Sequence, residues 1–125
     1  MAAGKLASLQ GEIGMGEIIK VIITFDSRKI AEEIGRDLVR RRLASCAQIS
    51  GPIKSIYWWK GKIEEAEEWV CTLKSRKDLY KTIEKEIRVL HPYDVPQIIA
   101  TDIHHALPEY VEWVKGETEM PKIGS

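Results

Sequence analysis

Two long extended segments meet at one tight turn near the middle of the chain. Residues 54–60, KSIYWWK, lead into the turn signal Lys60-Gly61-Lys62, and residues 63–74 return with strand character. Each arm can reach about 12 residues, or about 40 Å at about 3.3 Å per residue. The radius of gyration expected for a domain of this length is only about 14 Å. The hairpin is therefore expected to project beyond the core of its own chain.

The tip region of this hairpin is aromatic. Tyr57, Trp58 and Trp59 follow one another before the turn, and Trp69 lies on the returning arm. A small monomer cannot cover such an arm, and uncovered strand edges and apolar patches are typical of association surfaces. The pattern therefore predicts self-association, with Tyr57, Trp58, Trp59 and Trp69 at the interface between subunits.

Composition limits the number of domains and the class of partner. The 125 residues suit one domain, and 19 basic residues balance 19 acidic ones, so no net charge attracts nucleic acid or an anionic membrane. No apolar run is long enough to span a membrane. Two cysteines are too few for a disulfide framework, so a reducing, cytoplasmic location is expected. Residues 1–16 are expected to form a flexible leader, 17–116 the domain and 117–125 a flexible tail.

The segments before the hairpin predict a strand, a helix and a second strand. Residues 18–25, IIKVIITF, form a β-branched run that predicts a strand buried on nearly both faces. Residues 27–43 carry apolar side chains at helical spacing and predict an amphipathic helix. Strand character resumes at residues 44–48, and Gly51-Pro52 predicts a bend or bulge before the strand continues into the hairpin.

The segments after the hairpin complete the pattern. A second helix is predicted to begin at Ser75 and to run to residue 90. It ends there because Pro92 disfavours helical backbone at the residue before it. A strand over residues 97–103 and a short helix beginning at Pro108 follow. The order β-α-β-β-α-β with a C-terminal helix predicts an α+β, ferredoxin-like fold built on an antiparallel sheet.

Residues with metal-binding or catalytic chemistry are few and scattered along the chain. His91 is expected at the end of the second helix, and His104-His105 in an exposed loop. Cys46 and Cys71 are expected to be small apolar strand residues. The acidic run contains Glu64, Glu65, Glu67 and Glu68. We expect it to be a solvated hairpin arm, with hard cations or basic residues of another subunit as alternative partners. No nucleotide-binding motif occurs, and the pattern predicts a protein that is not an enzyme.

Three stretches resemble the CutA (CutA1) family of divalent-cation tolerance proteins. They are RRLASCAQI at 41–49, SIYWWKGKIEEAEEWVCTLKS at 55–75 and HPYDVPQII at 91–99. The resemblance implies a ferredoxin-like fold and a homotrimer in which long hairpins pair between subunits, an architecture similar to that of the trimeric PII signalling proteins. It also implies a role in tolerance of copper and other divalent metals, and no catalytic activity is established for the family.

The resemblance also suggests a metal site. The family's HPYxxPE segment corresponds here to His91, Pro92, Tyr93 and Pro96 followed by Gln97, so a carboxylate is missing beside His91. Two further copper ligands proposed in bacterial relatives correspond here to Ile23 and Leu90. No cofactor is required, and we expect His91 alone to give weak binding of Cu²⁺ or another divalent cation unless neighbouring subunits complete the site.

Two other functions remain open. One is a PII-like signalling or small-anion-binding trimer, because a lysine beside aromatic and imidazole groups suits a small anion. Its inter-subunit ligand cleft would be formed by Tyr57, Trp59, Lys74, His91, Tyr93 and Gln97. The other is a non-catalytic trimeric scaffold for a different protein.

Overall fold

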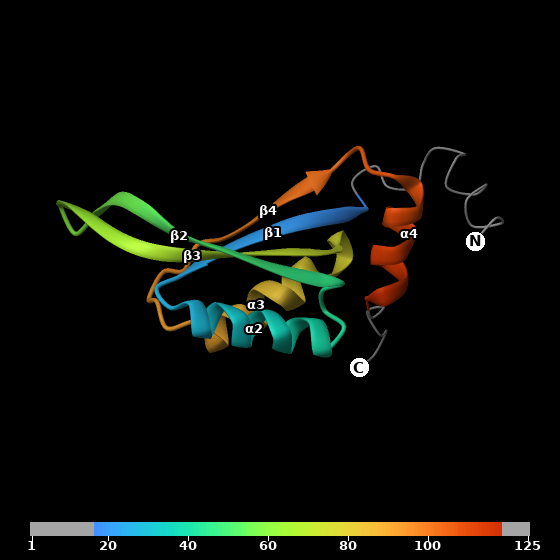
Figure 1. Ribbon diagram of the computed structural model, residues 1–125, viewed down its shortest axis with the longest axis horizontal. Helices are drawn as coiled ribbons and strands as arrows, with labels where there is room; N and C mark the ends of the chain where they lie inside the picture. Colours follow the sequence, from blue (N-terminus) through green and yellow to red (C-terminus); the bar gives the residue numbers. More distant parts are fainter. Residues whose placement is uncertain (1–16, 119–125) are drawn as a thin grey trace.

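Strand β1 lies inside a four-stranded antiparallel sheet, with helices α2 and α3 on one face (Figure 1). The computed structural model describes residues 17–118. The elements are β1 (Ile18–Phe25), α2 (Arg28–Arg40), β2 (Cys46–Trp59), β3 (Lys62–Arg76), the 3₁₀ turn η1 (Lys77–Leu79), α3 (Tyr80–Leu90), β4 (Ile98–Ile103) and α4 (Pro108–Glu117). The strand order β2-β3-β1-β4 and the two covering helices confirm the predicted α+β, ferredoxin-like fold.

The main hydrophobic core lies between the sheet and helices α2 and α3. Alternate β1 residues from Ile19 to Phe25 point into it and are fully or almost fully buried. On the other face, Ile18 packs with Val111 and Val114 of α4, at the end of the sheet away from the hairpin tip (Figure 1). Strand β1 is thus covered on nearly both faces, as its β-branched run predicted. Across the described residues, no helix is long and apolar enough to cross a membrane.

The hairpin of β2 and β3 extends well beyond the rest of the sheet (Figure 1). Strand β1 pairs with β3 only as far as Phe25 opposite Trp69, whereas β2 continues to pair with β3 to Trp59 opposite Lys62. The segments 53–59 and 62–68 therefore project as a two-stranded ribbon about 23 Å long at about 3.3 Å per residue. The two turn residues Lys60 and Gly61 both have positive φ, 52° and 81°, as a type I′ turn requires.

The bulge predicted at Gly51-Pro52 is present where the ribbon leaves the sheet. The β2–β3 register shifts between Ser50 and Ile53, and Gly51 has φ +135°. A Cβ atom at Gly51 would lie 2.9 Å from Trp69 Cδ1 and 3.1 Å from Trp69 Cα, so a larger residue would collide with β3. Because Gly51 has no Cβ, the two paired strands can lie close together at this bulge.

The structure corrects three predicted boundaries. Helix α2 ends at Arg40 rather than residue 43, because Arg42 adopts φ 63° and the Leu43 N–H turns back to the Leu38 carbonyl. Ser75 does not begin a helix: it is buried in β3 opposite Ile19, and its Oγ donates to the Leu43 carbonyl at 2.6 Å. The expected tail begins too early, since α4 includes Glu117, and Thr118 is buried. The expected leader and the rest of the expected tail lie outside the described residues.

Helix α2 packs tightly against the sheet at Gly35. A Cβ atom there would lie 3.1 Å from Ala47 Cβ and 3.3 Å from Cys71 Sγ. We expect Gly35→Leu to lower the free energy of unfolding by about 2 kcal/mol, since an overpacked helix–sheet contact must separate. Gly116→Leu is the matched control, because no atom lies within 4 Å of a Cβ at that position. Urea unfolding at one protein concentration measures both, and an equal effect of the two substitutions would contradict the prediction.

Candidate functional site at the base of the hairpin

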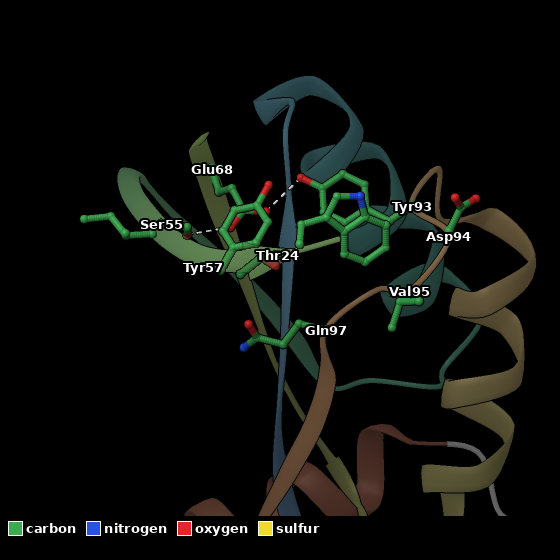
Figure 2. Close-up of a pocket in the computed structure, with 10 residues that line it drawn as sticks. Thr24, Ser55, Tyr57, Glu68, Tyr93, Asp94, Val95 and Gln97 are labelled. Atoms are coloured by element: carbon green, nitrogen blue, oxygen red, sulfur yellow. Dashed lines mark hydrogen bonds between the residues drawn. The ribbon is translucent and has the colours of Figure 1, made fainter. Parts of the chain in front are cut away.

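A cavity of about 530 Å³ opens where the projecting ribbon leaves the sheet (Figure 2). Its walls come from the end of β1, from the hairpin and from the loop between α3 and β4. The lining residues are Thr24, Ser55, Ile56, Tyr57, Trp59, Glu68, Tyr93, Asp94, Val95 and Gln97. The volume lies within the range of about 300–1,000 Å³ that is usual for small-molecule sites.

A buried carboxylate organises one wall of this cleft. Glu68 is only 8% exposed, and its two oxygens accept hydrogen bonds from Ser55 Oγ at 2.5 Å and from Tyr93 Oη at 2.8 Å (Figure 2). Within residues 17–118 both of these donors are neutral hydroxyl groups, and Glu68 forms no ion pair. The network ties the base of the hairpin to the loop that carries Tyr93, so it fixes the width of the cleft.

His91 supports Tyr93 from behind. Its ring stacks on Phe25, with centroids 4.5 Å apart and planes at 12°. Its Nε2 donates to the Thr24 carbonyl at 2.7 Å, and its Nδ1 accepts from the Tyr93 backbone N–H at 3.1 Å. Burial lowers the pKa of His91 below its ordinary value, although the Thr24 carbonyl and the carboxylates of Asp26 and Glu68 oppose this shift. The geometry is that of a neutral imidazole that holds the loop in place.

The cleft is acidic. Two carboxylates, Glu68 and Asp94, are among its lining residues, and lysine and arginine are absent from that set. Burial raises the pKa of the Tyr93 hydroxyl, and the hydrogen bond and charge of Glu68 raise it further, with a smaller contribution from Asp26. Tyr93 therefore remains a neutral hydrogen-bond donor to Glu68 through the physiological pH range.

Within one chain, the structure brings together four of the six residues that were predicted to form a ligand cleft between subunits. Tyr57, Trp59, Tyr93 and Gln97 line the cavity, and His91 lies in contact with Tyr93. Within one chain, Lys74 does not line this cavity. It lies on the same face of β3 but six residues from Glu68, which is about 20 Å along a strand. Its Nζ donates to Gln48 Oε1 at 2.9 Å instead.

The predicted metal ligand has no unused nitrogen in the described chain. Both nitrogens of His91 are hydrogen-bonded, so a metal would have to displace one of these contacts. Residues 17–118 contain no group of three or more histidine, cysteine or acidic side chains placed to hold a metal ion. Cys71 is a buried core thiol, as expected, and burial raises its pKa to about 12. His104 and His105 lie in an exposed loop, also as expected.

The four residues predicted for a subunit interface fall into different environments. Trp58 is 72% exposed near the hairpin tip, and Tyr57 and Trp59 are about 40% exposed beside the cleft. Trp69 is not on the projecting ribbon: it pairs with Phe25 and packs against the main core. The register therefore places Trp69 within the sheet, and the exposed aromatic residues of the hairpin are 57–59.

The sequence pattern missed the central role of Glu68. It treated Glu64, Glu65, Glu67 and Glu68 as one solvated acidic run, whereas Glu68 is buried and the other three are exposed. Alternation along the strand separates Glu68 from Glu65 and Glu67, which was the available signal. The contributions of Ser55 and Asp94 depend on how the hairpin and the α3–β4 loop meet in space, and the sequence did not indicate them.

These features define a ferredoxin-like α+β domain with an elongated hairpin and an acidic, aromatic cleft at the base of the hairpin. Residues 19–117 match the family described as CutA1 divalent ion tolerance protein. The chain belongs to this family, as the three resembling stretches predicted.

Individual relatives and solved structures agree with this assignment. The divalent-cation tolerance protein CutA of Pyrococcus horikoshii is 39% identical over 102 residues, which cover 82% of this chain and 99% of that protein. Protein CutA of Mus musculus is 38% identical over 104 residues, 83% of this chain but only 59% of the longer mouse protein.

Two solved structures show the same fold. The structure of CutA1 from the psychrotrophic bacterium Shewanella sp. SIB1 has a TM-score of 0.82 at 32% identity, covering 85% of this chain and 99% of that one. The periplasmic divalent cation tolerance protein CutA from Archaeoglobus fulgidus has a TM-score of 0.79 at 35% identity, covering 82% and 99%.

The lowered pKa of His91 predicts a pH dependence of stability. Below pH 6.5 His91 is protonated in the unfolded chain, whereas in the native state it stays neutral down to its lower pKa. The free energy of unfolding therefore falls as the pH drops through 6.5 toward the native pKa. We expect the wild type to lose more stability than His91→Gln between pH 7.5 and 5.5. Urea unfolding at both pH values measures this, and equal losses in the two proteins would contradict it.

Proposed function

We propose that this chain acts in divalent-cation tolerance as a self-associating, non-enzymatic protein. The observation that carries the proposal is the family match over residues 19–117, which includes the whole hairpin and the cleft. Relatives from bacteria and archaea carry the name divalent-cation tolerance protein. The mouse relative is considerably longer than this chain, so the function is proposed for the shared domain.

Self-association is supported by surface that the chain leaves uncovered. Among residues 17–118, the ribbon of residues 53–59 and 62–68 has no other strand beside it, and it exposes large apolar side chains. These are Ile53, Ile56, Tyr57, Trp58, Trp59 and Ile63. A long two-stranded ribbon with unpaired edges and this composition favours pairing with other copies. We propose a homotrimer with a PII-like arrangement of subunits.

Light scattering after size-exclusion chromatography tests the assembly. We expect a mass near three times the 14.2 kDa of one chain. Trp58→Glu should lower the mass or make it depend on concentration, because it places a charge in an apolar contact. Val89→Glu, at an exposed apolar residue of α3, is the matched control and should leave the mass unchanged. A stable monomer of 14.2 kDa would overturn the proposed assembly.

Direct metal binding is proposed only as weak binding at sites completed by neighbouring subunits. A single chain supplies His91 with both nitrogens engaged, and Gln97 stands where the resembling family has a carboxylate. Copper is the cation first expected. Tolerance can then depend on the assembly without a tight metal centre in each subunit.

Deletion of the gene from its host tests the tolerance function. We expect growth of the deletion strain to fall in medium containing raised Cu²⁺ and to recover when the wild-type gene is restored. Restoration with His91→Gln separates the role of this residue, and the same medium without added Cu²⁺ is the control. Equal growth of the deletion and wild-type strains at every concentration of Cu²⁺, Zn²⁺ and Co²⁺ would contradict the function.

The cleft favours a second candidate function, a small-molecule site of the PII-like kind. Its volume, its aromatic lining and its buried carboxylate are the features of a ligand pocket. A trimeric scaffold for another protein remains an alternative that needs no ligand.

We propose a cytoplasmic location on the basis of the two free cysteines. The Archaeoglobus relative is described as periplasmic, so cell fractionation is the test that distinguishes the two locations.

A further inference from the structure

We propose that the cleft at the base of the hairpin binds an organic cation, with an alkylammonium group held between its aromatic walls and the carboxylates of Glu68 and Asp94. This rests on the proposal that the cleft is a ligand site, and it differs from the small anion expected from the sequence for a cleft between subunits. The anion was expected because of Lys74, which lies elsewhere on the sheet.

The charge of the lining residues favours a cation. Glu68 and Asp94 both line the cleft without a lysine or arginine among their lining neighbours, and Asp26 adds negative potential at Tyr93 and His91. Lys60 and Lys62 lie beside Trp59 at the exposed end of the hairpin, and neither lines the cleft. A cation that entered the cleft would therefore meet attraction from several carboxylates.

The burial of Glu68 without a positively charged partner among residues 17–118 also favours a cation. Removing a carboxylate from water is unfavourable unless hydrogen bonds or an opposite charge compensate it. Ser55 and Tyr93 supply hydrogen bonds to Glu68 but no positive charge. A bound cation near the cleft wall would supply the missing charge without breaking either hydrogen bond.

The aromatic residues supply the second element of cation recognition. Tyr57, Trp59 and Tyr93 line the same cavity, and the faces of such rings attract ammonium groups. Within the chain itself, Lys60 Nζ lies 5.8 Å from the centroid of the Trp59 ring, which is the geometry of a cation–π contact. The Trp59 indole thus already takes part in a cation–π contact with the turn of the hairpin.

A divalent metal fits the cleft less well than an organic cation. Hard divalent ions need six or more oxygen ligands, or several protein donors around one point. Both oxygens of Glu68 already accept from hydroxyl groups, and residues 17–118 contain no cluster of three ligating side chains. An alkylammonium ion needs no direct coordination, only negative potential and ring faces.

Calorimetric titration of the full chain with choline chloride tests this proposal. The neutral isostere 3,3-dimethylbutan-1-ol and inorganic phosphate are the comparison probes. We expect choline to bind at least tenfold more tightly than the isostere, and phosphate not to bind at the cleft. Glu68→Gln and Asp94→Asn should each weaken choline binding about fivefold or more. Glu67→Gln is the matched control, because it removes the same charge from an exposed residue on the opposite face of β3.

The outcomes separate the ligand class from the existence of the site. Equal affinity for choline and its isostere, with loss in Glu68→Gln, would leave the cleft as a ligand site and overturn the cation. Tighter binding of phosphate would do the same. Absence of binding by all three probes, or choline binding unchanged in both variants, would overturn the site itself. Asp94 is exposed on a loop, so Asp94→Asn carries the test if Glu68→Gln fails to fold.

Discussion

The unequal length of neighbouring strands shapes this protein. Strand β3 spans Lys62–Arg76, but β1 pairs with it only from Trp69 to Arg76. The paired part is covered by helices and forms the core. In the part of the chain that the structure describes, the remainder pairs only with β2, so it projects beyond the sheet as a ribbon. The exposed aromatic surface and the location of the cleft follow from the point where β1 ends.

The cleft forms because the hairpin continues beyond the end of β1. At the end of β1 the hairpin continues while the chain of β1 turns into α2, and the α3–β4 loop fills part of the space beside it. Glu68 is the β3 residue next to the last one paired with β1, and its hydrogen bonds to Ser55 and Tyr93 join hairpin and loop. His91 holds the same loop from the core side through Thr24 and Phe25. The site therefore combines a rigid wall with an acidic interior.

The order of elements, the long hairpin and its bulge could all be predicted from local pattern. Each depends on features that lie within a few residues of one another, such as the β-branched run at 18–25, the Lys60-Gly61 turn and the Gly51-Pro52 pair. The start of α3 was less accessible. Ser75 resembles a helix cap in sequence, but burial opposite Ile19 and a hydrogen bond to the Leu43 carbonyl keep it in the strand.

The sequence alone determined the fold class, the family and the presence of a long projecting hairpin, because period and turn chemistry are local properties. It also suggested a ligand cleft between subunits, and four of the residues predicted for that cleft line one cavity within the chain. Only the tertiary structure decided that Lys74 lies far from them, that both nitrogens of His91 are engaged, and that Glu68 is buried. Those facts depend on strand register and on the meeting of a loop with a hairpin, which set contacts between residues distant in the chain.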